Sequence, residues 1–206
     1  MKPKALFVGV MFVGSLTAAA FIVAKVRPAA QTSQGFSLVV KQVEYPADGS
    51  GPRIEAIKVR NHKANGDFRL QTTYANGRVD VGFGQMGRGV FHVDENNKRL
   101  NYLSGMSPRD LSDTKMRSLE GFVAEETFLG YKVFHYRIVT EETGEVTDSY
   151  ICPALQGYTV KTVSTSRNGA KFILEVVQVI PGEPSFTVAD YPVDTKHYEA
   201  VHGKKP

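Results

Sequence analysis

Three glycines with the spacing G-x-G-x-x-G, at Gly82, Gly84 and Gly87, have the residue type and spacing of a nucleotide site. This fingerprint holds a pyrophosphate only where a strand leads into the glycines and a helix follows, because the helix N-terminus binds the phosphates. Here the β-forming residues 90–93 follow the glycines and run directly into the turn-like sequence DENN. We therefore expect a hairpin connection at this point and no nucleotide.

The histidines lack the spacing of a metal site. The closest pair, His197 and His202, is five residues apart, which misses the i,i+4 spacing that places two ligands on one face of a helix. His92, Asp94 and Glu95 flank a turn, where alternating side chains point to opposite faces. The sequence thus predicts no metal site among the five histidines, which are His62, His92, His135, His197 and His202.

No nucleophile has the setting of a catalytic residue. The single cysteine, Cys152, forbids an internal disulfide and has no adjacent base or cation that would lower its pKa, so it is expected to be a small buried hydrophobe. No G-x-S-x-G motif occurs, and Ser107 is better explained as a helix cap. A carboxylate pair assembled through space stays open as an alternative. We otherwise expect no enzymatic activity and no cofactor.

Composition and charge exclude a nucleic-acid partner. The 206 residues are 42% hydrophobic and 22% charged, which suffices for one well-packed domain with an appendage. Four of the 25 basic residues lie before residue 35, and from there onward 21 basic residues balance 21 acidic ones. The domain therefore lacks the positive patch of a nucleic-acid binder.

The N-terminus predicts export. Lys2 and Lys4 precede an uncharged apolar run over residues 5–24, as in an export signal. The run is longer than a signal core of about 7–15 residues and reaches the roughly 18–20 residues that span a bilayer, so a cleaved signal and an uncleaved transmembrane anchor both fit. We expect a linker at 25–35 and a domain that faces the periplasm, either free or anchored in the inner membrane.

Ten short β-rich runs alternate with turn residues, which is typical of an antiparallel sandwich or barrel. Asn-Gly pairs at 65–66, 76–77 and 168–169 suit hairpin turns. One helix is predicted over 108–118, with Ser107 as N-cap and Pro108 at the first helical position. The predicted strands are 36–45, 54–60, 68–74, 79–83, 90–93, 99–103, 131–139, 146–152, 158–163 and 171–180.

The later strands predict a groove. In "YKVFHYRIV" and "KFILEVVQVI" both faces are apolar, whereas an antiparallel sheet ordinarily leaves one face wet. Either a helix or a neighbouring chain covers the second face, or that face lines an apolar groove for a ligand. The groove and its lid would be formed by Phe134, Tyr136, Ile138, Phe172, Leu174 and Val176, with Leu111 and Met116 from the helix.

The chain resembles the LolA/LolB superfamily, the unclosed β-barrels of the bacterial envelope that carry lipid-modified proteins. The similarity covers residues 36–195 and is carried by strand and turn order. The similar segments are "GVFHVDENNKRLNYLSG" before the short helix, followed by "FLGYKVFHYRIV" and "DSYICPAL". Phe186 and Tyr191-Pro192 stand at the positions that end the family pattern. The resemblance implies a fold and a compartment, and no functional residue of the family is carried over.

These observations together predict a mainly β domain with a minor α component. It is an antiparallel curved sheet, or unclosed half-barrel, of about ten strands with a short lid helix, over residues 36–195, followed by a polar tail at 196–206. Its expected function is to bind an apolar ligand, or the acyl chains of a lipid-modified protein, on the concave face. The alternatives are an anchored signalling or scaffolding module of the envelope and a hydrolase with a spatially assembled carboxylate site.

Overall fold

The computed structural model describes residues 34–194. The predicted signal or anchor at 1–24, most of the linker and the tail at 196–206 lie outside these residues. Within them, no helix is long and apolar enough to cross a membrane.

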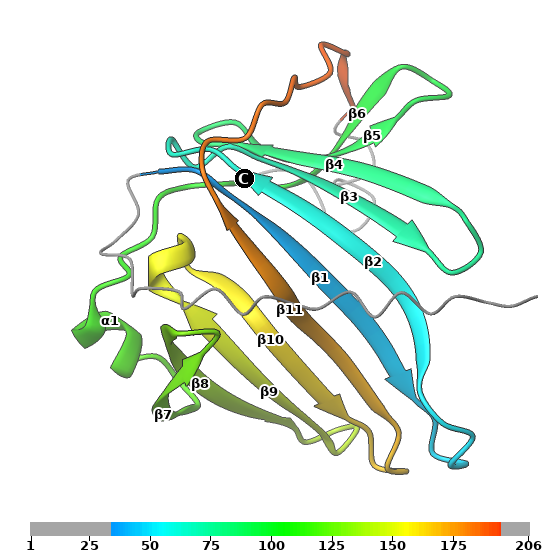
Figure 1. Cartoon of the computed structure of the whole chain (residues 1–206), viewed down its shortest axis with the longest axis vertical. Helices are drawn as coiled ribbons and strands as arrows, with labels where there is room; N and C mark the ends of the chain where they lie inside the picture. Colours follow the sequence, from blue (N-terminus) through cyan, green and yellow to red (C-terminus); the bar gives the residue numbers. More distant parts are fainter. Residues whose placement is uncertain (1–33, 195–206) are drawn as a thin grey trace, which may run out of the picture.

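Within residues 34–194, twelve strands form one open sheet, in the order β12-β6-β5-β4-β3-β2-β1-β11-β10-β9-β8-β7 (Figure 1). All neighbours pair antiparallel except the parallel pair β12–β6. The predicted fold class, a mainly β unclosed sheet with one short helix, is confirmed. The strands are β1 Phe36–Tyr45, β2 Arg53–His62, β3 Phe68–Tyr74, β4 Val79–Gln85, β5 Gly89–Asp94, β6 Arg99–Ser104, β7 Phe122–Phe128, β8 Tyr131–Thr140, β9 Glu145–Cys152, β10 Tyr158–Thr165, β11 Lys171–Pro181 and β12 Val193–Asp194.

The Asn-Gly pairs make the turns that the sequence predicts. Gly66, Gly77 and Gly169 have φ values of 93°, 82° and 87°, a conformation that costs glycine little. The ten predicted strands agree with the observed ones to within two residues at each end. Strands β7 and β12 were not predicted, because charged residues interrupt the apolar pattern of "FVAEETF" and β12 has only two residues.

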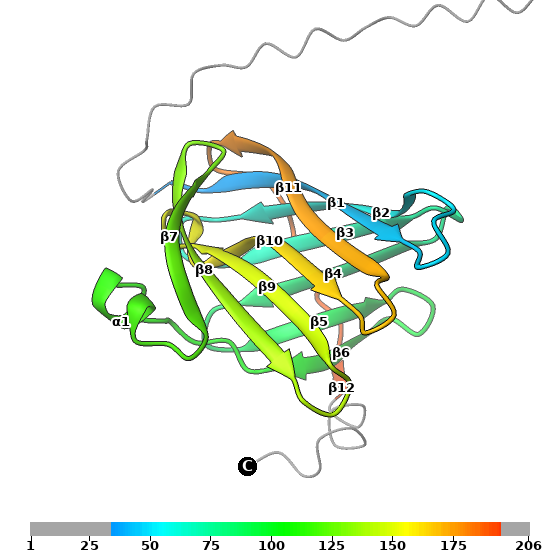
Figure 2. The same cartoon turned by 90° about the horizontal axis from the view of Figure 1, so that it is seen from below.

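The sheet is strongly curled, and side chains from distant strands meet inside it. β2 and β10 are three positions apart in the sheet, which would separate them by about 14 Å if it were flat. The guanidinium carbon of Arg60 on β2 nevertheless lies 4.9 Å from the centroid of the Tyr158 ring on β10. In Figure 2 the strands β7–β10 accordingly cross in front of β1–β6. The surface between these two halves is called the inner face below.

The main core joins the two halves. One cluster of buried side chains contains residues of β1 together with residues of β8, although three strands separate β1 from β8 in the sheet. Packing of this kind can hold a sheet curled without closing it into a barrel. The cluster consists of Phe36, Leu38, Val40, Tyr131, Val133, Cys152, Leu155, Val160 and Val176.

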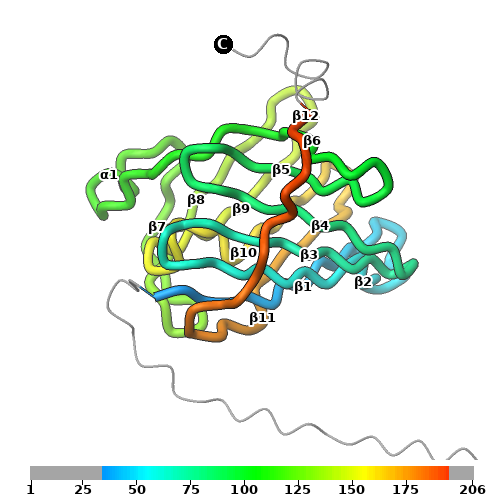
Figure 3. Tube along the Cα trace, turned by 90° about the horizontal axis from the view of Figure 1, so that it is seen from above, coloured from blue at the N-terminus to red at the C-terminus, as the bar shows by residue number. Residues whose placement is uncertain are grey.

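The opposite face of β4–β6 is covered by the end of the described chain. Phe83, Phe91 and Tyr102 form a second buried cluster, against which Val188 and Tyr191 pack. Figure 3 shows the segment that leads to β12 crossing over this part of the sheet. The outer face of β4–β6 is therefore covered by the chain itself.

The helix is shorter than predicted and begins later. α1 spans Asp113–Arg117, and its N-cap is Ser112, whose hydroxyl accepts a hydrogen bond from the Lys115 amide. The prediction of Ser107 as N-cap was wrong, because Asp110 accepts a hydrogen bond from the Ser112 amide and so fixes the turn before the helix. Met116 is buried against Phe134 and Tyr136, and the Tyr136 hydroxyl donates a 2.6 Å hydrogen bond to the Met116 carbonyl.

The glycine motif lies in a hairpin, as expected, but the connection is shorter than the motif. Gly82 and Gly84 belong to β4, and only Gly87 lies in the turn, which leads directly into β5. Gly84 is paired with Phe68, and a Cβ atom at this position would overlap the Phe68 ring and approach the Met106 sulfur to 2.7 Å. Gly84 is therefore required by the close approach of an aromatic ring.

Substitution of these two glycines should separate packing from backbone strain. Gly84→Ala is expected to lower the free energy of unfolding by roughly 1–3 kcal/mol, because Phe68 must move. Gly87→Ala should cost only about 1 kcal/mol, since its φ of 78° disfavours alanine but no atom of the described residues lies within 4 Å of the added carbon. Urea denaturation followed by circular dichroism measures both, and a smaller loss for Gly84→Ala than for Gly87→Ala would contradict this expectation.

Candidate functional site

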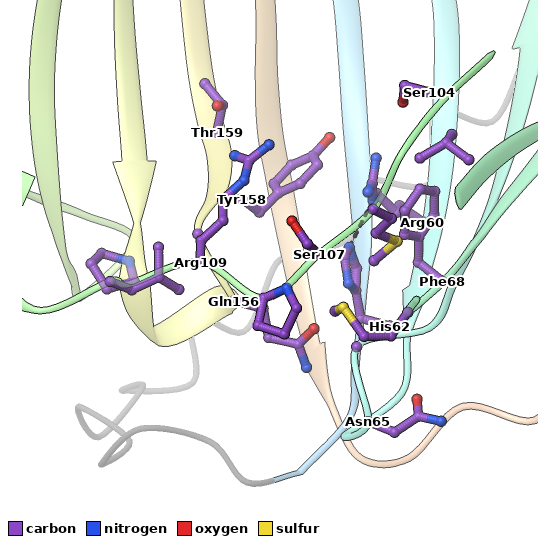
Figure 4. A pocket seen from close by; sticks show the side chains of 18 of the residues that line it. Arg60, His62, Asn65, Phe68, Ser104, Ser107, Arg109, Gln156, Tyr158 and Thr159 are labelled. Atoms are coloured by element: carbon purple, nitrogen blue, oxygen red, sulfur yellow. Dashed lines mark hydrogen bonds between the residues drawn. The ribbon is translucent and has the colours of Figure 1, made fainter. Parts of the chain in front are cut away.

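A cavity of about 910 Å³ opens on the inner face, between the β2–β3 side and the β10–β11 side of the curled sheet. The segment from Ser104 to Leu111 lines its mouth, and Figure 4 shows this segment crossing in front of the strands. Its apolar wall includes Phe68, Met86, Val90, Met106, Leu111 and Leu174.

Two of the predicted groove residues line this cavity, namely Leu111 and Leu174. Phe172, on the same strand as Leu174, lines a second hollow of about 430 Å³, and Val176 lies in the main core. Phe134, Tyr136 and Met116 are buried against one another and form the cluster on which Leu111 packs. Ile138 is 57% exposed and lines neither hollow. The structure therefore brings the β11 residues to the inner face and places the β8 residues behind Leu111 or at the surface.

Arg60 is held between two aromatic rings inside the cavity. Its guanidinium carbon lies 3.6 Å from the centroid of the Phe68 ring and 4.9 Å from that of the Tyr158 ring. Such cation–π contacts favour the charge without supplying an acceptor for its hydrogens. Burial lowers the pKa of Arg60 to about 10, which leaves the side chain charged at neutral pH.

His62 is the acceptor for one hydrogen of that guanidinium. Arg60 Nε donates a 2.7 Å hydrogen bond to His62 Nε2, and the imidazole stacks on Phe36 at a centroid distance of 4.7 Å. Burial, and then the positive charge of Arg60, lower the pKa of His62 to about 3, although the nearby Gln156 side chain opposes the shift. His62 is therefore neutral at physiological pH. Because Nε2 accepts, the ring proton is on Nδ1, a buried atom with no hydrogen-bond partner among residues 34–194.

Neither Arg60 nor His62 was predicted as a site residue, although β2 carries a signal for them. Along β2 the basic side chains Lys58, Arg60 and His62 share the inner face, while Ile57 and Val59 point the other way and are 37% and 38% exposed. This alternation is inverted relative to an ordinary half-buried strand. The predicted strand ended at Arg60 and left His62 in the following turn, which hid the pattern.

The charge of the cavity lining is one-sided. Two arginines, Arg60 and Arg109, line the cavity, and no aspartate or glutamate of the described residues does. In the view of Figure 4 the Tyr158 ring lies between these two arginines. The second hollow has the opposite character, since three of its nine lining residues are Glu44, Glu55 and Glu145. The inner face is thus basic and apolar at one end and acidic at the other.

His135 and Cys152 are titratable groups that do not line the cavity. His135 lies between two carboxylates, with Nδ1 2.9 Å from Glu126 Oε1 and Nε2 2.7 Å from Asp148 Oδ1. Burial raises the pKa of the Cys152 thiol to about 11, which leaves it unreactive at neutral pH. No group of three or more His, Cys, Asp or Glu side chains within 34–194 has the geometry of a metal site.

The buried neutral state of His62 predicts a pH dependence of stability. Below pH 6.5 His62 is protonated in the unfolded chain, whereas in the folded chain it stays neutral down to about pH 3. The free energy of unfolding should therefore fall by up to about 1.4 kcal/mol for each pH unit by which the pH is lowered in this window. His62→Gln removes this titration and should flatten the profile between pH 6.5 and pH 4, whereas the control His92→Gln, outside the cavity, should not. Equal slopes for wild type and His62→Gln in urea denaturation would refute the assignment.

Comparison with known proteins finds similarity among solved structures. No protein-family model matches the chain, and no curated protein matches it at a significant level. PNGF-II is similar over 81% of this chain, with 12% identity and a TM-score of 0.42, and the chain spans only 32% of its length. The Pseudomonas aeruginosa MucA/MucB complex is similar over 74% of this chain, with 10% identity and a TM-score of 0.42, and 53% of that chain is covered. A LolA superfamily protein from Nitrosomonas europaea is similar over 78% of this chain and 90% of its own, with 9% identity and a TM-score of 0.41.

Proposed function

We propose that this protein binds an apolar ligand, such as a lipid or the acyl chains of a lipid-modified protein, in the cavity of the half-barrel, without enzymatic activity. The observation that carries the proposal is the open cavity of about 910 Å³ on the inner face of the sheet. Cavities that hold small ligands measure about 300–1,000 Å³ and are lined mainly by apolar side chains with a few polar groups.

Burial of an alkyl chain would supply the affinity. Each buried methylene contributes about 0.8 kcal/mol, so eight methylenes against the apolar wall would contribute roughly 6 kcal/mol before the cost of ordering the ligand. Leu174 of β11 and Leu111 of the mouth segment line the cavity and would contact such a chain. Phe134, Tyr136 and Met116 would act indirectly by supporting Leu111.

The segment at the cavity mouth has the properties of an entrance. Residues 107–110 are exposed, and α1 fixes the segment at one end through the buried Met116. Leu111 reaches from this segment to Gly157, where a Cβ atom would come within 2.7 Å of a Leu111 methyl group. An entering ligand would therefore pass residues 104–111.

Binding is tested with the purified full chain and a neutral naphthylamine probe whose fluorescence rises in apolar surroundings. We expect saturable binding, and at least about tenfold weaker binding for Leu174→Asp, because the ligand would have to contact a buried charge. Val177→Asp is the matched control, since Val177 is 50% exposed on the same strand and does not line the cavity.

The two variants also separate loss of the site from loss of the fold. Both should keep the wild-type far-UV circular dichroism. No saturable binding by a folded wild-type chain, or equal weakening by Leu174→Asp and Val177→Asp, would overturn the proposal.

We further propose that the domain functions outside the cytoplasm, on the strength of Lys2, Lys4 and the apolar run 5–24. A reporter that is active only in the periplasm, fused after Pro206, should be active, and activity of a cytoplasm-only reporter instead would contradict this location. N-terminal sequencing of the exported chain separates the two fates, since an intact Met1 means an anchor and a start near Phe21 or Gln31 means cleavage.

A further inference from the structure

Hydrogen-bond donors without acceptors gather at one place in the cavity. Arg60 Nε donates a hydrogen bond to His62 Nε2. Neither of the Nη groups of Arg60 donates a hydrogen bond to any residue of 34–194. The Nδ1 atom of His62 is buried and makes no hydrogen bond of good geometry within 34–194, although the Gln156 side chain lies near the ring. An unpaired buried donor is costly, and the half-buried guanidinium of Arg60 keeps its Nη donors available to a ligand in the cavity.

The surroundings offer these donors no internal counter-charge. Arg60 forms no salt bridge within the described chain, and no carboxylate of the described residues lines the cavity. Some arginines elsewhere in the sheet have acidic partners, as Arg137 Nε has Asp148 Oδ1 at 2.9 Å, whereas Arg69 contacts the neutral Gln71. The second arginine of the cavity, Arg109, adds to the excess positive charge.

A fixed geometry distinguishes Arg60 from a mobile surface arginine. The rings of Phe68 and Tyr158 lie 3.6 Å and 4.9 Å from its guanidinium carbon, and His62 fixes Nε. Phe36, His62 and Phe68 face one another in register across β1, β2 and β3, and they stack as a ladder behind the charge. The planar fork of donors is thus held ready for an oxyanion, which it binds through two parallel hydrogen bonds.

We infer that the cavity selects an amphiphile with an anionic oxygen head group, a carboxylate or a phosphate, and that Arg60, positioned by His62, binds the head while the apolar wall binds the chain. This inference rests on the proposed function and names the class of ligand for the same cavity. A neutral lipid would leave the Nη donors of Arg60 without a charged acceptor, and a cationic amphiphile would be repelled.

The inference is tested by competition against the neutral naphthylamine probe with three twelve-carbon ligands, namely laurate, dodecyl phosphate and dodecanol. Their alkyl chains are matched, so the ratio of their affinities reports the head group alone. For the full wild-type chain we expect the anions to bind at least about tenfold more tightly than dodecanol, as a charged hydrogen bond provides. Whichever of laurate and dodecyl phosphate binds with the higher affinity shows whether a carboxylate or a phosphate is the preferred head group.

Variants then assign the preference to the site. Arg60→Met should bring the ratio of laurate to dodecanol affinity close to one, and Arg60→Lys, which keeps the charge but loses the planar fork, should retain part of it. Arg69→Met is the matched control, because Arg69 lies on the adjacent strand and points to the opposite face. This control should keep the wild-type ratio.

The outcomes separate this inference from the function on which it rests. If the wild-type chain does not bind the neutral probe, the cavity proposal itself fails. If the probe binds but laurate, dodecyl phosphate and dodecanol compete equally, the selection of anions is overturned and the apolar cavity stands. A wild-type preference for anions that survives unchanged in folded Arg60→Met would likewise overturn the role of Arg60.

Discussion

The contact between the two halves of the curled sheet is the constraint on which the remaining features depend. Leu38 of β1 and Val133 of β8 belong to one buried cluster, although β11, β10 and β9 separate their strands. With this cluster in place, the inner face is closed at its centre and hollow at its two ends. The cavity is therefore a consequence of how a twelve-stranded sheet curls without closing.

The same curl places the positive charge of Arg60 inside the cavity without a carboxylate partner among the described residues. A basic side chain at this position of a flat antiparallel sheet would reach water, whereas here Tyr158 comes across from β10 and encloses it. Phe68 and His62 stabilise the guanidinium but supply only one acceptor, so part of its hydrogen-bonding capacity is directed to the cavity. If an oxyanion binds these groups, as proposed, it would stabilise the folded protein, and binding and stability would be linked properties.

Local sequence patterns predicted most of the fold because strand alternation and Asn-Gly turns are local properties. Ten strands and the three Asn-Gly hairpins follow from these patterns alone. The helix N-cap was misplaced because Ser107 and Ser112 are both acceptable caps, and the choice depends on the turn that Asp110 forms. The edge strand β7 was not predicted because its charged residues interrupt the apolar pattern of "FVAEETF".

The site was less predictable, because it depends on which strands face one another. Both faces of β8 are apolar, and nothing in its sequence says that Phe134 and Tyr136 would pack beneath Met116 while Leu174 of β11 reaches the cavity. Arg60 and His62 became recognisable only when the register showed them on the inner face beside Phe68. The sequence signal for these residues is the inverted alternation of β2, in which basic side chains face inward. It becomes visible only when the predicted strand 54–60 is extended by two residues to include His62.

The central claim is that an amphiphile lies inside the half-barrel with its charged head at Arg60. The most direct measurement is a crystal structure of the full chain with a dodecanoate that carries bromine on its terminal carbon, located by the anomalous signal of the bromine. We predict the carboxylate oxygens within hydrogen-bond distance of Arg60 Nη, and the bromine inside the cavity between the β2–β3 and β10–β11 sides of the sheet. A bromine on the outer surface, or a carboxylate in solvent with the alkyl end toward Arg60, would contradict the claim.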